Sequence, residues 1–350
     1  MIHLGTRGGR MLAATTAASA LVLAGCSEPS ANETTAEGTA TAANEQVTLT
    51  VYTSEPEEKA DEINAAFEAA NPDINVEIYR AGTGDLNARI AAEKQSGDIE
   101  ADILWAADAP TFEAYAAEGD LVELDGVDTS MVIDQARDPN NFYVGTRIIP
   151  TVIAYNTTEV QGDDIPSSWQ DLTDSRYANQ IVMPNPAVSG AAAFNASAWL
   201  LEPQLGVEWL RSIFANSPMI ADSNGPTSQE IAGGGHPVGI VVDYLVRSLA
   251  ADGSPIAAVY PTEGAPYITE PAGIFANSEN QDAAKRYIEF LLSEEGQRIA
   301  VDQAYLPVRN DVGTPEGAPE LADTPLMDFD LKAVSENQAS AIEAFQSLAG

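Results

Sequence analysis

The chain has 350 residues, of which 45% are hydrophobic, and its 53 acidic residues outnumber 16 basic ones to give a formal net charge of −37. This excess of negative charge excludes nucleic acid and anionic lipid surfaces as partners, because both would be repelled. The length predicts two globular units of about 100–200 residues each, and any anionic ligand requires a site whose local attraction overcomes the surrounding charge.

The N-terminus has the order of an export signal. Arg7 and Arg10 precede an uncharged stretch of apolar and small residues, 11–23, which is typical of a secretory signal peptide and too short for a membrane span. Leu23-Ala24-Gly25-Cys26 closes the stretch and resembles the bacterial lipobox, in which the cysteine is acylated and becomes the first mature residue. The alternative is an ordinary cleaved signal followed by a chance cysteine.

Two observations favour the lipobox interpretation. Cys26 is the only cysteine in the chain, so a disulfide cannot explain it. Residues 27–44 contain no large apolar side chain, as a flexible tether would. We therefore expect residues 1–25 to be a signal peptide, residues 26–46 a tether, and Cys26 the lipid attachment that holds the exported protein on the outer face of the cell membrane. Removal of the signal peptide takes away two basic and no acidic residues, which leaves a net charge of −39.

Three strand and helix pairs follow the tether. The alternation in Val47–Tyr52 predicts a strand, and apolar residues at helical spacing between Ala60 and Ala70 predict a helix that stops at Asn71-Pro72. The pattern repeats as a strand over 74–78, a helix from 86 to about 97, a strand over 102–106 and a helix over 111–118. Consecutive units of this kind predict a parallel sheet covered by helices on both faces.

The loops after these three strands carry polar and small residues. Ligands of open parallel sheets bind beyond the carboxyl ends of the strands, so these loops should meet at one edge. The candidate ligand-binding residues on them are Thr53, Ser54, Arg80, Gly82, Thr83, Gly84 and Asp108.

A second segment of the same character begins at the long strand-like run 147–156, which is expected to cross between the two units. A helical stretch around Trp169 and Leu172, a strand over 181–183 and helices over 190–201 and 205–214 follow. Strands are predicted over 238–242 and 256–260, and the run 272–275 is expected to cross back. Helices are predicted over 284–291 and 293–301, and residues 311–350 are expected to form an acidic tail of loops with one terminal helix.

Five short motifs in this order resemble the landmarks of family 1 extracellular solute-binding proteins, in the branch that contains ferric-ion binders. The motifs are Val51–Ser54, Trp105–Asp108, Ala154–Thr157, Met183–Pro186 and Phe290–Gln297. The resemblance implies the type II periplasmic-binding-protein fold, an α/β architecture in which parallel-type sheets form two lobes joined by crossing hinge strands. It also implies a cleft between the lobes, closure on a ligand, no cofactor, a monomer, and an ABC permease and ATPase as partners.

On this basis residues 47–147 together with about 272–310 are expected to form the first lobe. Residues from about 148 to 271 are expected to form the second, and 311–350 the C-terminal tail. Fold analogy leaves the ligand open, so the ligand has to be argued from the site.

Two turns are candidate anion sites. Gly82-Thr83-Gly84 and Ser189-Gly190-Ala191 both precede predicted helices, where free backbone N–H groups favour anions. Plain helix capping by Thr83 and Ser189 is the alternative for each turn alone. One turn lies in each expected lobe, however, so closure would bring both onto one ligand. Ser189-Gly190-Ala191 also resembles the anion-contacting turn of the ferric binders.

Ferric iron is one ligand hypothesis. The resemblance implies a pair of adjacent tyrosines after the strand 238–242, but the sequence there is Asp243-Tyr244-Leu245, so the second tyrosine is missing. His236 lies in a glycine-rich turn and His3 falls within the signal peptide. An iron site would have to use Tyr244 with Asp243 and Glu263, and the full set of the histidine and double-tyrosine binders cannot be assembled.

A phosphorylated or phosphonate solute is the preferred hypothesis. The runs Arg80–Gly84, Tyr260–Pro266 and Thr269–Pro271 resemble relatives assigned to hexose phosphates and 2-aminoethylphosphonate. Such a ligand needs N–H and O–H donors around its phosphorus oxygens and carboxylates that accept from a hydroxyl or an amine. Thr83 and Ser189 with the glycines would supply the donors, and Asp243 and Glu263 the carboxylates.

Other classes of function fit the sequence less well. The only thiol is expected to carry the anchor, no histidine has a plausible base role, and no His/Cys metal cluster or phosphate-loop motif is present. We therefore expect a binding protein of an ABC importer rather than an enzyme. A surface sensor that presents its ligand to a membrane kinase would use the same lobes and stays open.

Overall fold

The computed structural model describes residues 46–107, 109–320 and 323–349. All of them belong to one compact unit, Asn44–Gly350. Cys26, the expected signal peptide and the tether up to residue 45 lie outside the described residues. Within the described part of the chain, no helix is both long and apolar enough to cross a membrane.

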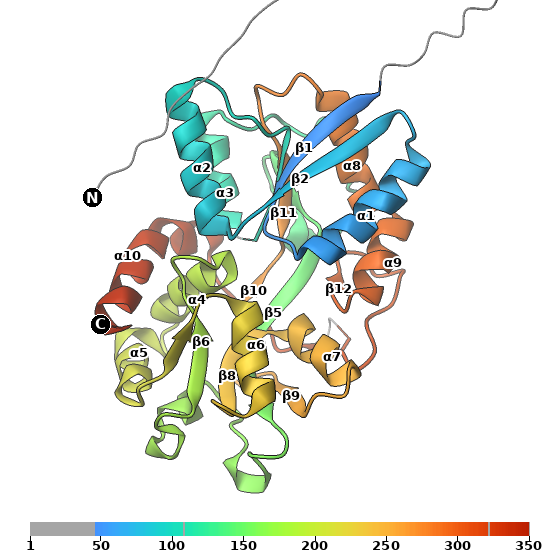
Figure 1. The fold of residues 1–350 in the computed structure, drawn as a ribbon. Helices are drawn as coiled ribbons and strands as arrows, with labels where there is room; N and C mark the ends of the chain where they lie inside the picture. Colours follow the sequence, from blue (N-terminus) through green and yellow to red (C-terminus); the bar gives the residue numbers. More distant parts are fainter. Residues whose placement is uncertain (1–45, 108, 321–322, 350) are drawn as a thin grey trace, which may run out of the picture. The chain divides into compact units, whose positions relative to one another are not determined.

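The first lobe is built on a five-stranded sheet with the order β2-β1-β3-β11-β4 (Figure 1). Strand β1 pairs in parallel with both β2 and β3, whereas β11 is antiparallel to β3 and β4. The strands are β1 (Val47–Thr53), β2 (Ile74–Arg80), β3 (Ile103–Trp105), β4 (Tyr143–Gly145) and β11 (Pro271–Ile274).

Helices cover both faces of this sheet, and the strand alternation decides which core each side chain enters. Leu49 and Val51 join a core formed with helices α1 (Glu57–Ala70) and α8 (Gln281–Leu292), where Phe67 packs edge-on against Tyr287 at 5.1 Å between ring centroids. Tyr52 faces the opposite core with α2 (Thr83–Ser96) and α3 (Ala109–Glu118). This two-sided burial confirms the predicted succession of strand and helix units.

The second lobe is built on a seven-stranded sheet whose main path is β10-β5-β8-β6-β7, with β9 and β12 also paired to β5. Strand β6 is parallel to β7 and β8, and β5 is antiparallel to each of its partners. The strands are β5 (Arg147–Asn156), β6 (Ile181–Pro184), β7 (Met219–Ala221), β8 (Val238–Val242), β9 (Ile256–Val259), β10 (Tyr267–Ile268) and β12 (Leu306–Pro307).

Strand β5 connects the two lobes, as its long strand-like run predicted. Ile148 belongs to the core of the first lobe, while Ile149 and Val152 belong to the core of the second. Figure 1 shows β5 running from the upper sheet into the lower one. The polypeptide is therefore buried at the crossing, and the hinge is part of both cores.

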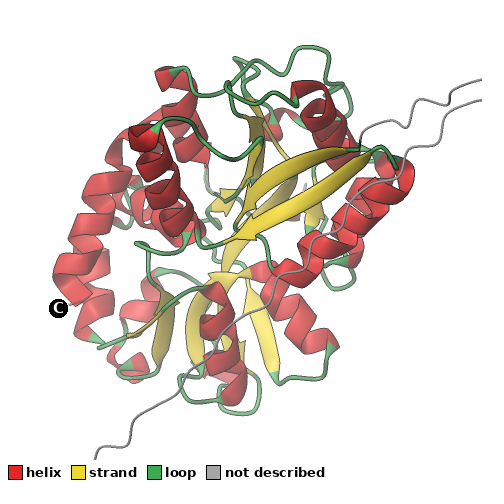
Figure 2. Ribbon diagram, turned by 45° about the horizontal axis from the view of Figure 1, so that its top comes forward, coloured by secondary structure: helices red, strands yellow, loops and turns green. Residues whose placement is uncertain are grey.

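The helices of the second lobe flank its sheet, as Figure 2 shows. Three tryptophans pack against one another in its core. Trp169 and Trp199 lie 5.3 Å apart between ring centroids, and Trp199 and Trp209 lie at the same separation. The indole N–H of Trp169 donates to the carbonyl of Gly264 at 2.9 Å, so this large side chain is buried without an orphaned polar group. The helices are α4 (Gly190–Leu201), α5 (Gly206–Ala215), α6 (Asn224–Gly233) and α7 (Asp243–Ala251).

The C-terminal part contains the expected terminal helix. Helix α9 (Glu294–Asp302) follows α8, and the chain ends in α10 (Leu331–Ala349), which lies against α3 and α4. Phe345 is buried against Phe214 at 5.0 Å between ring centroids. Helix α10 is the expected terminal helix, and its periodicity in the sequence is weak because only three of its side chains, Val334, Ala341 and Phe345, are buried.

The two-lobe α/β architecture is confirmed, with two corrections to the details. The sheets are mixed rather than parallel throughout, because β5 and β11 enter them in the antiparallel sense. The stretch around Trp169 forms short 3-10 turns at Gln170–Thr173 and Ser175–Tyr177 instead of an α-helix.

Candidate ligand-binding cleft

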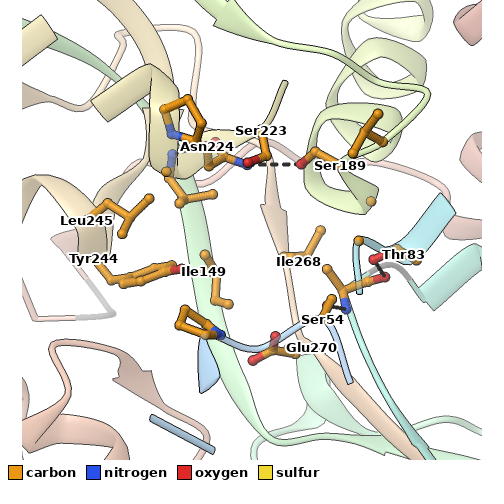
Figure 3. Close-up of a pocket in the computed structure, with 18 of the residues that line it drawn as sticks. Ser54, Thr83, Ile149, Ser189, Ser223, Asn224, Tyr244, Leu245, Ile268 and Glu270 are labelled. Atoms are coloured by element: carbon orange, nitrogen blue, oxygen red, sulfur yellow. Dashed lines mark hydrogen bonds between the residues drawn. The ribbon is translucent and has the colours of Figure 1, made fainter. Parts of the chain in front are cut away.

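A cavity of about 460 Å³ lies between the two lobes, and both lobes supply its walls. Ser54, Arg80 and Thr83 come from the strand ends of the first lobe, as the parallel-sheet rule predicted. Ser189, Tyr244 and neighbouring residues come from the second lobe. Figure 3 shows Ser54 and Thr83 of the first lobe across the open space from Ser189 of the second lobe.

Five helices begin at the wall of this cavity. The residue that caps the N-terminus of each helix lines the cavity, and the helices are α1, α2, α4, α6 and α7. A helix N-terminus carries a partial positive charge and N–H groups that have no acceptor within the helix. Five such termini around one cavity favour an anionic ligand without requiring a cluster of cationic side chains. The five capping residues are Pro56, Gly82, Ser189, Ser223 and Val242.

A hydrogen bond joins two of these termini within the second lobe. The amide of Asn224 donates to Ser189 Oγ at 3.0 Å, and Ser189 Oγ also accepts from the backbone N–H of Ala192 at 3.3 Å (Figure 3). Asn224 Oδ1 accepts from the N–H of Val242 at 3.3 Å. The starts of α4, α6 and α7 are therefore held together as one rigid wall.

The first lobe holds its own polar groups in a similar way. Ser54 Oγ accepts from the N–H of Ala107 at 3.0 Å, and Thr83 Oγ1 donates to the carbonyl of Ala107 at 3.4 Å. Arg80 lies on the exposed rim, where its guanidinium donates to the carbonyl of Glu55 at 3.2 Å. Arg80 is thereby oriented at the mouth of the cavity, and its positive charge adds to that of the helix termini.

The lobes touch through glycines beside the cavity. A Cβ atom added at Gly82 would lie 2.8 Å from the carbonyl oxygen of Val188, and one at Gly190 would lie 2.7 Å from Thr83 Oγ1. The backbone N–H of Gly84 reaches across to the carbonyl of Val188 at 3.4 Å. Glycine is therefore required here because the two backbones approach more closely than a side chain permits.

A buried charge cluster forms the base of the cleft. Arg147, only 1% exposed, pairs through Nη1 with Glu55 Oε2 at 2.8 Å. Its guanidinium also lies over the rings of Trp105 at 4.8 Å and Tyr305 at 4.2 Å. Arg147 stands at the start of β5, so the cluster sits where the chain crosses between lobes.

Glu270 belongs to the same cluster and also lines the cavity. Its carboxylate Oε2 lies 3.0 Å from Arg147 Nε, but neither atom is placed for a hydrogen bond. Burial, followed by the nearby Glu55 carboxylate, raises the pKa of Glu270 well above its usual range. Sequence reasoning missed Glu270 because it follows a turn and precedes Pro271, and nothing in that pattern shows where its side chain points.

The structure brings most of the predicted ligand-binding residues to the cavity, but not all. Ser54, Arg80, Gly82, Thr83, Ser189, Gly190 and Tyr244 line it. Thr53, Gly84 and Ala191 do not, since Thr53 and Ala191 are buried and Gly84 makes the contact between lobes. Asp108 lies outside the described residues. The missed residues include Glu270 and the start of α6 at Ser223 and Asn224, whose Ser-Asn-Gly-Pro sequence reads equally well as a turn.

The two carboxylates predicted to bind the ligand, Asp243 and Glu263, form hydrogen bonds within the second lobe instead. Asp243 is fully buried and accepts from Arg247 Nη1 at 2.6 Å and from the hydroxyl of Tyr260 at 2.9 Å. Glu263 accepts from the backbone N–H groups of Trp169 and Gln170, both at 3.1 Å, and thereby caps a 3-10 turn. Neither lines the cavity, so their side chains serve the structure of the second lobe.

The fold and cleft together define a class of protein. Two α/β lobes, a buried connecting strand and a polar cavity between them form the architecture of a protein that captures a small solute. Residues 98–333 match the family of bacterial extracellular solute-binding proteins, and the chain belongs to this family. It is accordingly a solute-binding protein that acts outside the cytoplasm, and not an enzyme.

Relatives and solved structures agree with this assignment. A candidate 2-aminoethylphosphonate-binding periplasmic protein of Salmonella typhimurium is 26% identical over 256 residues, which cover 68% of this chain and 71% of the relative. The periplasmic binding protein AfuA from Actinobacillus pleuropneumoniae, with exogenous fructose-6-phosphate bound, has a TM-score of 0.78 at 23% identity over 86% of this chain and 98% of its own. Iron-bound HitA from Pseudomonas aeruginosa has a TM-score of 0.77 at 22% identity, and the match covers 87% of this chain and 100% of HitA. These likenesses establish the periplasmic-binding-protein fold.

Proposed function

We propose that this protein is the binding component of an ABC importer and that its ligand is a small phosphorylated or phosphonate compound, which it delivers to a permease. The observation that carries the proposal is the convergence of five helix N-termini on one cavity. A phosphoryl group presents three oxygens that accept from such N–H groups, and its negative charge matches the helix dipoles. A fructose-6-phosphate-bound relative of the same fold and a candidate phosphonate-binding relative support this ligand class.

Ferric iron is the alternative, and the cleft supports it less well. Tyr244 lines the cavity, but the residue after it is Leu245, and Asp243 and Glu263 are occupied elsewhere. Among the described residues, no group of three or more His, Cys, Asp or Glu side chains is placed to hold a metal ion. Hard Fe(III) requires several such oxygen or nitrogen ligands, so a single tyrosine with one nearby glutamate is a poor set.

Calorimetry on the chain without its first 26 residues tests the ligand class with matched pairs. Fructose 6-phosphate is compared with fructose, and 2-aminoethylphosphonate with ethylamine, so that each pair differs chiefly in the phosphorus group. We expect binding of the phosphorus-containing member only. Tight binding of Fe(III) with a visible tyrosinate absorption band, and no response to either phosphorus compound, would reverse the order of the two hypotheses.

A site variant tests the wall of helix N-termini. Ser189→Ala removes the hydroxyl that links Asn224 to the start of α4. Loss of these two hydrogen bonds, worth about 0.5–1.5 kcal/mol each, loosens the wall and predicts a decrease in affinity of roughly fivefold to 150-fold. Affinity equal to that of the unaltered protein would remove Ser189 from the site.

We further propose that the protein is held at the membrane by a lipid on Cys26. The support is the sequence Leu23-Ala24-Gly25-Cys26 at the end of an apolar stretch and the lack of any other cysteine in the chain. Cells that express the protein should incorporate labelled fatty acid into it, and Cys26→Ser should abolish the label and release the protein from membranes. Label that persists in the variant would contradict the anchor.

A further inference from the structure

Glu270 occupies a strained backbone position at the cavity wall. Its φ is +42°, in the left-handed region that residues other than glycine rarely adopt because it is sterically strained. Its carbonyl is fixed by Thr146, which donates from Oγ1 at 2.8 Å and from the backbone N–H at 3.2 Å. The conformation is thus imposed by neighbours, and it holds the carboxyl group at the cavity, opposite Ser189 and Asn224 in Figure 3.

The positive charge of Arg147 does not fully neutralise the carboxylate of Glu270. Arg147 faces two buried carboxylates, and Glu55 takes its hydrogen bond at 2.8 Å as well as a second one from the hydroxyl of Tyr305. Glu270 Oε2 is close to Arg147 Nε without a hydrogen bond to it, so this oxygen is buried and unsatisfied. A buried carboxylate without a full partner either takes up a proton or pairs with an outside group.

The other titratable groups near Glu270 do not supply that partner. The ammonium of Lys59 donates to the carbonyl of Gln303 and lies 5.0 Å from the ring centre of Tyr244 and 4.5 Å from that of Tyr305. Burial lowers the pKa of Lys59 to about 8. Burial also raises the pKa of both tyrosines, so they stay neutral. The groups that act on Glu270 are therefore Glu55, which repels its negative charge and also shares a side-chain hydrogen bond with it, and Arg147 and Lys59 as incomplete counter-charges.

We propose that Glu270 binds the ligand as a neutral carboxylic acid that donates a hydrogen bond to the ligand's anionic group. This inference rests on the proposed function, in which the ligand is a phosphorus oxyanion. In its ionised form Glu270 would repel that anion inside a cavity of low dielectric constant. In its neutral form it adds an O–H donor to the N–H donors of the helix termini. Anion binding and the proton on Glu270 then stabilise each other, so the affinity depends on pH.

The competing possibility is an ionised Glu270 that pairs with an ammonium group on the ligand. The two possibilities make opposite predictions for Glu270→Gln, because glutamine keeps the shape and a hydrogen-bond donor but cannot carry negative charge. Ethylphosphonate and 2-aminoethylphosphonate are suitable probes, since they differ only in the amine.

Calorimetry with both probes on the unaltered protein, Glu270→Gln and Glu270→Ala provides the test. At neutral pH we expect Glu270→Gln to bind both probes within about threefold of the unaltered protein, and Glu270→Ala to bind both about tenfold more weakly, the equivalent of one hydrogen bond. Above the pKa of Glu270 the affinity of the unaltered protein should fall by up to about tenfold per pH unit. In the Glu270→Gln variant the affinity should not depend on pH through residue 270, so any pH dependence that remains comes from other groups, including Lys59.

Several outcomes would overturn the inference. One is a loss of tenfold or more for 2-aminoethylphosphonate alone in Glu270→Gln, which would show an ionised carboxylate that holds the amine. Another is unchanged binding of both probes by Glu270→Ala, with thermal unfolding recorded to establish that the variant is folded. In both cases the phosphonates still bind, so the proposed ligand class survives.

An infrared measurement without ligand separates the remaining cases. The difference spectrum between the unaltered protein and Glu270→Gln at neutral pH should contain the C=O stretch of a protonated carboxylic acid. Its absence, with carboxylate bands in its place, would refute the neutral acid directly. If neither phosphonate nor a phosphate ester binds the unaltered protein, the proposed function fails and this inference fails with it.

Discussion

Gly84 offers a test of whether the contact between lobes controls ligand affinity, because it does not line the cavity. A Cβ atom at this position would lie 2.4 Å from the carbonyl oxygen of Ala187, whereas ordinary contact distances begin at 3.4 Å. In Gly84→Ala the two backbones must therefore separate by about 1 Å, and the hydrogen bond from the Gly84 N–H to Val188 is lost. Both effects act only where the lobes meet.

The expected magnitude combines these two penalties with the gain from replacing a helical glycine by alanine. Overpacking costs about 1–3 kcal/mol and the lost hydrogen bond about 0.5–1.5 kcal/mol, while alanine within a helix is more favourable than glycine by about 0.5–1 kcal/mol. These terms sum to a net penalty of about 0.5–4 kcal/mol on the form in which the lobes touch, which weakens ligand binding by roughly twofold to several hundredfold. The thermal unfolding of the ligand-free protein should change little, because separated lobes relieve the clash.

Calorimetry with a phosphonate probe, paired with thermal unfolding in the absence of ligand, measures the two quantities separately. Gly233→Ala is the matched control, since a Cβ at this helical glycine has open space around it and the residue does not line the cavity. Equal affinity of Gly84→Ala and the unaltered protein would show that binding does not require the close approach of the lobes.

Three further predictions concern stability. Arg147→Met leaves two buried carboxylates without their counter-charge and should lower the free energy of unfolding by about 3–5 kcal/mol at neutral pH. The loss should be smaller in acid, where the carboxylates take up protons. A loss below about 1 kcal/mol in denaturant titrations would contradict the role of the cluster. If α10 is part of the folded unit, Phe345→Ala should lower the free energy of unfolding by about 3 kcal/mol in the same assay. An unchanged free energy of unfolding would show that α10 does not contribute to the stability of the unit. Because the pKa of Lys59 is lowered to about 8 in the folded protein, the unfolded chain binds more protons above that pH, and the free energy of unfolding should rise with pH between about 8 and 10.5. In Lys59→Gln this rise should be smaller. An equal rise in the variant would assign the pH dependence to other groups.

The sequence predicted the features that depend on local pattern. Strand alternation in β1 and helical spacing in α1 reflect burial on one face, and they identified the alternating elements of the first lobe. The parallel-sheet rule then placed Ser54 and Thr83 at the cavity without knowledge of any contact. These inferences need only the residues of one element and its immediate neighbours.

The groups that sequence reasoning misplaced depend on distant partners or on competing local ones. Glu270 points into the cavity because Thr146, 124 positions earlier, fixes its backbone. Asp243 was expected at the cleft because it follows a buried strand, yet it pairs with Arg247 one helical turn further on. The i, i+4 spacing of an acid and a base was visible in the sequence and gave a reason to expect that ion pair.

The charge distribution explains why the cleft relies on helix termini rather than on lysines and arginines. A chain with a net charge of −37 repels an anion at long range, and this repulsion is screened beyond about 8 Å at physiological ionic strength. The helix N-termini act at hydrogen-bond distance inside the cavity, where salt screens them much less. Raising the salt from about 0.01 to 0.15 M should therefore speed the association of a phosphonate probe and leave its dissociation nearly unchanged, as stopped-flow measurements can determine. An association rate that falls with salt would indicate that cationic side chains dominate the site, in conflict with a cavity in which the backbone N–H groups supply most of the anion attraction and Arg80 only adds to it.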